Sequence, residues 1–113
     1  MKAPRETDLV RVCLAYLRLR GVFAWRVNSG AVAGEHGGKR RFVRFNGAKG
    51  CSDVLGILPG GRFLAVETKM PGRKTTPHQQ AFLDAVRAAG GLALVVRDVA
   101  ELAAALDAQA LGS

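Results

Sequence analysis

The sequence predicts an α/β fold, in which a mixed β-sheet is flanked by helices on both faces. Helical and strand-like periodicities alternate along the 113 residues. The segment Phe63–Val96 has the pattern strand, helix, strand, which predicts a parallel pair of strands joined by a crossover. Hydrophobic residues make up 49% of the chain, enough to build one core. We therefore expect a single domain over residues 1–113.

The first part of the chain predicts a helix followed by a strand. The helix should run from about Pro4 to Arg20, because proline suits the first helical position and Gly21 can end the helix. Large apolar and smaller or basic residues then alternate over Val22–Asn28, which predicts a strand. Ser29–Gly38 is rich in glycine and small residues, so we expect a loop there.

The segment Lys39–Phe45 alternates basic and apolar residues and indicates another strand. Lysine and arginine commonly protect the edge of a sheet, which would account for these charges without a function. The whole chain, however, has 17 basic and 9 acidic residues, a net charge of +8, which favours a polyanion as partner. We therefore favour a phosphate-binding flap, and the candidate DNA contacts here and at the end of the preceding strand are Arg26, Asn28, Ser29, Arg40, Arg41 and Arg44.

A hairpin and a capped helix are predicted next. Asp53–Leu58 and Arg62–Lys69 have strand character on either side of the turn Pro59-Gly60-Gly61. Thr76-Pro77-His78-Gln79 then opens a helix, with threonine as N-cap, proline at the first position and glutamine closing a capping box.

The end of the chain predicts a strand and a last helix. Leu92–Val96 is continuously apolar, which is typical of a central strand buried on both faces. Asp98 and Glu101 repeat the capping pattern ahead of an alanine-rich helix that should reach about Ala110.

Several classes of protein are disfavoured by composition. No apolar run approaches the roughly 18 residues that a membrane-spanning helix needs. The first residues lack the basic-then-apolar order of a signal peptide. Cys13 and Cys51 are too few for a disulfide framework and lack the partners of a zinc site, so we expect reduced thiols and a cytoplasmic protein.

The predicted hairpin brings two carboxylates together. One register places Asp53 opposite Glu67, and a tighter turn would place it opposite Thr68; in either case the two acids lie near each other. Glu67 and Lys69 are two residues apart on the same strand, so both side chains project from the same face.

This set of residues suits the metal-assisted hydrolysis of a phosphodiester. Two neighbouring carboxylates repel each other unless a cation lies between them, and Mg²⁺ prefers oxygen ligands. The carbonyl of Thr68 is a further candidate ligand, and Lys69 could orient a water or stabilise charge on a phosphate. A glutamate and a lysine at this spacing also form ordinary surface ion pairs. These charges end an apolar, interior strand, where α/β folds collect their sites, and this placement gives the catalytic interpretation equal weight with the structural one.

Two runs of residues resemble the core of the PD-(D/E)XK nucleases, and more narrowly the virus-type replication-repair nuclease (VRR-NUC) family. They are Gly50-Cys51-Ser52-Asp53-Val54-Leu55-Gly56 and Phe63-Leu64-Ala65-Val66-Glu67-Thr68-Lys69. The resemblance continues through Glu6, Gly21, the run Trp25-Arg26-Val27-Asn28-Ser29-Gly30, Thr76-Pro77-His78-Gln79 with Phe82, and Gly90-Gly91. It departs from the superfamily pattern at Ser52, where the superfamily name places a proline.

The resemblance implies a restriction-endonuclease-like fold and a metal-dependent DNA endonuclease. Asp53 and Glu67 would bind Mg²⁺ or Mn²⁺, Lys69 would serve the attacking water, and Glu6 and Gln79 would be further members of the site. Without the resemblance, Glu6 is explained as an acid at a helix N-terminus and Gln79 by its capping box.

The chain is similar to the minimal stand-alone phage and bacterial members of this family. This similarity implies a homodimer in the cytoplasm of a bacterial or phage-infected cell that cuts branched DNA, such as four-way (Holliday) junctions, in DNA repair. Two alternatives stay open: a non-catalytic DNA-binding module that keeps the nuclease fold, and a restriction-type enzyme with a fixed sequence target. The short chain disfavours the second, since it has little room for a separate base-reading element.

Overall fold

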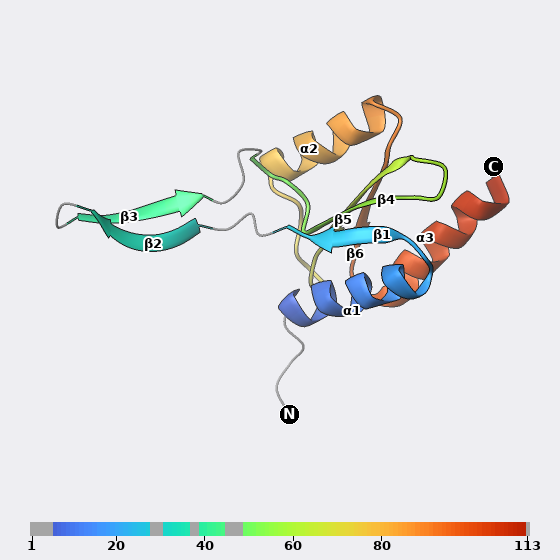
Figure 1. Cartoon of the computed structure of the whole chain (residues 1–113), viewed down its shortest axis with the longest axis horizontal. Helices are drawn as coiled ribbons and strands as arrows, with labels where there is room; N and C mark the ends of the chain where they lie inside the picture. Colours follow the sequence, from blue (N-terminus) through green and yellow to red (C-terminus); the bar gives the residue numbers. More distant parts are fainter. Residues whose placement is uncertain (1–5, 28–30, 37–38, 45–48, 113) are drawn as a thin grey trace.

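The computed structural model describes residues 6–27, 31–36, 39–44 and 49–112. Its elements in chain order are α1 (Glu6–Leu19), β1 (Phe23–Arg26), β2 (Ala31–His36), β3 (Lys39–Arg44), β4 (Val54–Ile57), β5 (Phe63–Thr68), α2 (Pro77–Ala88), β6 (Leu92–Val96) and α3 (Val99–Gly112). Four strands form a mixed sheet in the order β1-β4-β5-β6. Helix α2 covers one face of this sheet, and α1 and α3 cover the other (Figure 1). The predicted α/β class with helices on both faces is confirmed.

The centre of the sheet is the predicted hairpin of β4 and β5. The backbone N–H of Leu58 donates to the carbonyl of Arg62 (2.8 Å), which closes the glycine-containing turn. The strands are antiparallel, with Val54 opposite Val66. β5 and β6 are parallel and are connected through α2, as the strand-helix-strand pattern predicts.

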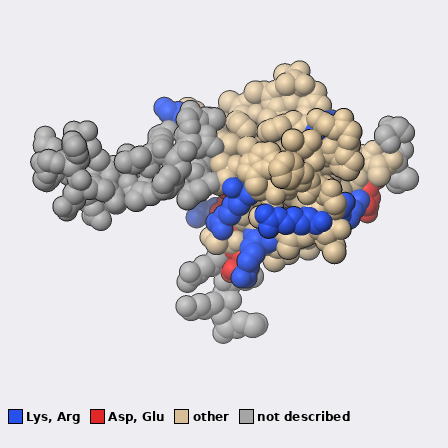
Figure 2. All heavy atoms as spheres, viewed as in Figure 1, with Lys and Arg blue, Asp and Glu red and all other residues tan. Residues whose placement is uncertain are grey.

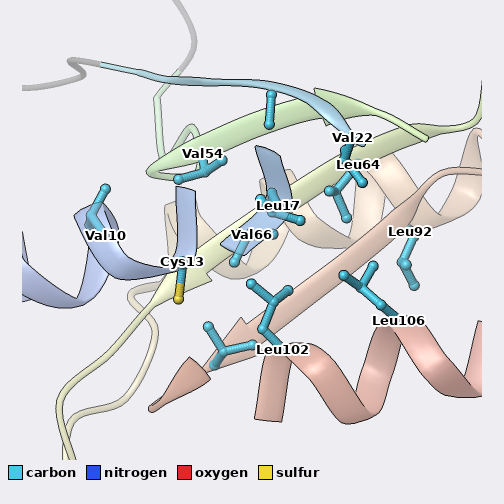
Figure 3. Close-up of a cluster of buried hydrophobic side chains, with 12 residues drawn as sticks. Val10, Cys13, Leu17, Val22, Val54, Leu64, Val66, Leu92, Leu102 and Leu106 are labelled. Carbon is cyan, nitrogen blue, oxygen red and sulfur yellow. The ribbon is translucent and has the colours of Figure 1, made fainter. Parts of the chain in front are cut away.

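Two groups of apolar side chains hold the layers together. The larger group lies between the sheet and the α1/α3 layer, and Leu17, Leu64 and Leu102 within it are completely buried (Figure 3). The smaller group packs α2 against the opposite face through Leu83, Val86, Ala65 and Ala93. Consecutive residues of β5 therefore serve opposite cores, which explains why this strand is apolar without alternation.

The ends of α2 and α3 follow the predicted capping chemistry. The hydroxyl of Thr76 accepts from the backbone N–H of Gln79, and the side chain of Gln79 accepts from the backbone N–H of Thr76. The carboxylate of Asp98 accepts from the backbone N–H of Glu101 (2.8 Å) at the start of α3. None of the helices in the described part of the chain is long and apolar enough to cross a bilayer.

The position predicted for Leu92–Val96 is wrong in one respect. β6 lies at the edge of the described sheet, beside β5, and is not a central strand. Its apolar composition has a different cause: α2 packs on one face of the strand and α3 on the other, so both faces are covered at the edge.

The loop predicted over Ser29–Gly38 is also corrected, because β2 (Ala31–His36) is a strand. It pairs antiparallel with the predicted strand β3 in a separate two-stranded sheet, which in Figure 1 extends away from the four-stranded sheet. Glycine and alanine are uncommon in strands. The extended conformation of β2 therefore depends on its hydrogen bonds with β3.

Candidate active site

Three carboxylates converge at the open end of the β4–β5 hairpin. Asp53 directly precedes β4, and continuing the observed register by one residue places it opposite Glu67. Glu6, the first residue of α1, reaches the same point from the layer below the sheet. One carboxylate oxygen from each of the three residues lies within 4.8 Å of the others. The first of the two predicted registers is therefore the one adopted, and the structure brings Glu6 together with the two acids of the hairpin.

Asp53 is held rigidly by its neighbours. Its Oδ2 accepts from both the backbone N–H (2.9 Å) and the hydroxyl (2.8 Å) of Thr68. Its own carbonyl accepts from the backbone N–H of Val27 (2.8 Å), which ties this residue to the end of β1. Both bonds from Thr68 go to one oxygen, so they orient the side chain without using the other carboxylate oxygen.

Glu67 is the most deeply buried of the three acids. Its side chain is 1% exposed, and its Oε2 is buried without a hydrogen-bond partner among the described residues. Burial, and next the charge of Asp53, raise the pKa of Glu67 to about 8, while the charge of Lys69 opposes this rise. A carboxyl group that is buried beside two other acids is destabilised in its ionised form.

Lys69 follows β5 on the same side as Glu67. It is 9% exposed, and its backbone N–H donates to the carbonyl of Val96 (3.0 Å) on the neighbouring strand. The chain therefore fixes the backbone of this residue on both sides, through β5 and through β6. The charge of its ammonium group lowers the pKa of Glu67 and so favours the ionised carboxylate.

The donor set of this cluster fits a hard divalent cation. All three groups are carboxylates, the ligands that Mg²⁺ and Mn²⁺ prefer, and no softer ligand is among them. The buried, unpartnered Oε2 of Glu67 is a polar atom that needs a partner, and a cation would supply one. Binding of a cation would also offset the burial and the charge of Asp53, which together raise the pKa of Glu67.

The loop before Asp53 is fitted against the start of α2. Gly50 has a positive φ of 73°, and a Cβ added to it would lie 2.1 Å from the carbonyl oxygen of His78. It would also lie 2.6 Å from the backbone nitrogen of Gln79, a predicted member of the site whose side chain is engaged in the capping box. Sequence reasoning missed this contact, although a glycine three residues before a candidate ligand is a signal of close backbone approach.

The structure separates the candidate DNA contacts into three groups. Arg26 is exposed at the end of β1, next to Val27, which donates a hydrogen bond to the carbonyl of Asp53. Arg40, Arg41 and Arg44 lie on β3. Asn28 and Ser29 fall outside the described residues.

A pocket of about 600 Å³ lies at the other end of the β4–β5 hairpin, away from the acids. Leu58, Arg62 and Gln109 are among the residues that line it. Arg62 already donates to Gln109 and to the carbonyls of Gly90 and Gly91, so its guanidinium serves the packing of the fold. The carboxylates lie instead at a sheet end, an arrangement that suits a long polymer more than a small ligand in a cavity.

A mixed sheet whose middle hairpin ends in Asp53, Glu67 and Lys69 is consistent with the PD-(D/E)XK-like class of nuclease folds. The model of the VRR-NUC domain family matches residues 5–100, and the chain belongs to this family. A solved structure described as a VRR_NUC domain is similar in fold, with a TM-score of 0.64 and 21% sequence identity, over 93% of this chain and 97% of that chain. Among curated proteins there is no match. Membership of the family implies a nuclease-type function in DNA processing.

Proposed function

We propose that this chain is a metal-dependent endonuclease that hydrolyses phosphodiester bonds of DNA and is selective for branched DNA such as four-way junctions. The observation that carries the proposal is the convergence of Glu6, Asp53 and Glu67 within 4.8 Å beside a nearly buried Lys69. Burying charged groups costs stability, and such groups gather at functional sites. A cluster of three acids and one lysine is therefore better explained by a function than by packing.

The residues divide the work according to their environment. Glu6, Asp53 and Glu67, with the carbonyl of Thr68 as a further candidate, would hold Mg²⁺ or Mn²⁺. When bound, such an ion supplies Lewis acidity toward a phosphate oxygen and lowers the pKa of a coordinated water. Lys69 would orient the attacking water and stabilise negative charge on the phosphate, because its backbone is fixed by two strands. Gln79, at the start of α2, would help position the catalytic residues, because its backbone lies against Gly50 in the loop before Asp53.

We infer that Arg26, Asn28, Ser29, Arg40, Arg41 and Arg44 contact phosphates around the cleavage site. Arginine recognises phosphate through paired N–H groups. Arg26 directly precedes Val27, whose backbone N–H donates to the carbonyl of Asp53. We also propose a cytoplasmic location, in which the thiols of Cys13 and Cys51 would stay reduced.

We also propose that the active form is a homodimer, because a four-way junction is resolved by cuts in two strands. An apolar row across three strands supports this: Phe23 pairs with Ile57, and Ile57 with Phe63, and their side chains are 70%, 39% and 38% exposed. In Figure 1, α2 lies on this face over the β5–β6 half of the sheet. Replacing Phe23 with serine should convert the dimer into a monomer in sedimentation or light scattering, and a wild-type monomer would contradict this part of the proposal.

The nuclease proposal is tested by digesting labelled duplexes, flaps and four-way junctions with and without Mg²⁺. We expect cleavage only with the metal, fastest on the junction, and a loss of at least about 100-fold in Asp53→Ala and Lys69→Ala. Asp84→Ala, which removes an exposed acid from α2, is the matched control and should cut like wild type. Salt-sensitive binding without cleavage would favour the non-catalytic DNA-binding module, and cleavage of one duplex sequence alone would favour a restriction-type enzyme.

A further inference from the structure

Two arginines on α1 are not explained by the packing of the fold. Arg11 and Arg18 are both exposed, and they are seven residues apart, so they lie on the same side of the helix. At 1.5 Å per residue they are separated by about 10 Å along the helix axis. In Figure 2, basic side chains gather over α1 and β1 on the face that is shown.

The side of α1 that carries these arginines is defined by its neighbours. Val10, Cys13 and Leu17 point into the core under the sheet. Arg20 points toward α3, because it forms an ion pair with Asp107 (3.0 Å). Arg18 precedes Arg20 by two residues, about 200° around the helix, so Arg11 and Arg18 lie on the side away from α3. That side lies toward the β1 edge of the sheet, because α1 packs mainly against β1 whereas α3 packs against β6 at the other edge (Figure 1).

A third arginine continues this row toward the acids. After the turn at Gly21 the chain runs back along α1 as β1, which ends at Arg26. Ala24 is buried against the α1 side of the sheet, and Arg26, two residues later, projects from that same side. The next residue, Val27, donates its backbone N–H to the carbonyl of Asp53. Arg18, Arg11 and Arg26 therefore lead along the junction of α1 and β1 to the carboxylate cluster.

The charges of this row are available to a ligand. Among the described residues, no ion pair holds Arg18 or Arg26, whereas Arg20 and Arg87 each have an acidic partner. Within the described part of the chain, Arg11 forms an exposed ion pair with Asp8 (3.3 Å), which is worth less than about 1 kcal/mol and is easily exchanged for a phosphate.

We propose that Arg11, Arg18 and Arg26 form a track for the backbone of one strand of a duplex arm, and that this track guides the arm to the carboxylate cluster. The proposal deepens the proposed nuclease function by naming where the DNA lies outside the scissile phosphate. One strand presents a phosphate at about every 3.4 Å of the duplex axis, so two arginines about 10 Å apart can contact different phosphates of the same strand. The contacts are to phosphates, so the track recognises double-stranded DNA without reading its sequence.

The test is the salt dependence of binding to a fluorescein-labelled duplex, measured by anisotropy with every variant built on Asp53→Asn to prevent cleavage. Removing two phosphate contacts should lower the slope of log K against log salt by about 1.8. We expect this change, with weaker binding, in Arg11→Ala/Arg18→Ala. The control Arg20→Ala/Arg87→Ala removes the same charge from sites outside the row and should leave the slope within about 0.5 of the parent. A conservative variant, Arg11→Lys/Arg18→Lys, keeps both positive charges and should have the slope of the parent. The alanine variant is checked for folding, so that its lower slope can be assigned to the lost phosphate contacts.

Equal slopes in the two alanine double variants would overturn the track, because the effect would then come from net charge alone. An unchanged slope in Arg11→Ala/Arg18→Ala, or no binding of duplex by the parent, would also overturn it. Cleavage by the otherwise wild-type chain in Mg²⁺ is measured separately. If that chain does not cleave but the double variants still differ in slope, the nuclease assignment fails and the track stands.

Discussion

A single oxygen of Asp53 accepts two hydrogen bonds from Thr68, one from the backbone N–H (2.9 Å) and one from the hydroxyl (2.8 Å). Asp53 directly precedes β4 and Thr68 is the last residue of β5, where it lies between Glu67 and Lys69 in the sequence. Thr68 is completely buried, so these bonds do not compete with water. The residue between the two charged members of the motif therefore orients the carboxylate on the opposite strand.

Replacing Thr68 with valine should separate this orienting role from packing. Valine keeps the branched shape and the backbone N–H but lacks the hydroxyl, so Asp53 loses one of its two hydrogen bonds. A hydrogen bond to a charged group contributes about 1.5–3 kcal/mol, and loss of a group that orients a metal ligand weakens metal binding by about 10–100-fold. We expect the Mg²⁺ concentration for half-maximal cleavage to rise by that factor. Thr68→Ser, which restores a hydroxyl, should recover most of the loss, and equal behaviour of the two variants would contradict this role.

Replacing Gly50 with alanine should displace Asp53 and the start of α2 from each other. The new Cβ would meet the carbonyl of His78 at 2.1 Å, and the backbone has a φ of 73° that alanine disfavours. Gly21→Ala is the matched control, since Gly21 has a φ of 77° but nothing within 4 Å of the added atom. In urea unfolding the control should lose about 1 kcal/mol, and Gly50→Ala should lose clearly more and also cleave more slowly. Equal losses of stability would mean that the contact with α2 is unimportant.

The sequence predicts the hairpin and its acids well because both depend on short-range geometry. The turn at Gly60-Gly61 allows two pairing registers of the strands on either side of it. In both registers, Asp53 lies close to Glu67 at the other end of the hairpin. The capping box of Thr76 and Gln79 is equally local, and it forms as predicted. These features require no knowledge of how the layers pack.

Features that depend on partners distant in the sequence are harder to predict. β2 is a strand of weakly strand-forming residues because β3 supplies its hydrogen bonds. The edge position of β6 depends on which helices cover it, and an apolar run alone does not reveal this. The hydrogen bonds from Thr68 to Asp53 depend on side-chain conformation, and the exposed side of α1 depends on where α3 packs.

Addition of Mg²⁺ should stabilise the wild-type chain by binding to the folded state alone. Thermal unfolding measured with Mg²⁺ and with EDTA should give a higher midpoint in Mg²⁺, by an amount that grows with the logarithm of its concentration. Asp53→Asn and Glu67→Gln should lose this shift, because each removes a ligand from the cluster. Asp84→Asn, at an exposed position on α2, should keep it. Ionic screening by the added salt would act on all variants alike, so a shift that is lost with either acid reports binding at the cluster.

Metal-free protein should become less stable as the pH rises, because of Glu67. Burial raises the pKa of this carboxyl from 4.5 to about 8. Between those pH values the folded chain keeps a proton that the unfolded chain has lost, so the free energy of unfolding falls with increasing pH. Below this window both states hold the proton, and above it neither does, so the contribution is constant there.

The size and the origin of this effect are both measurable by urea unfolding in EDTA at about pH 5 and about pH 9. One pH unit corresponds to about 1.4 kcal/mol, so the loss from Glu67 has an upper limit of about 5 kcal/mol, which relaxation around the charge will reduce. Glu67→Gln is neutral at every pH and should remove most of the difference, making it more stable than wild type at the higher pH. Asp84→Asn carries an equal charge change on the surface and should follow wild type. If Glu67→Gln showed the same pH dependence as wild type, burial of this carboxyl would not be the cause.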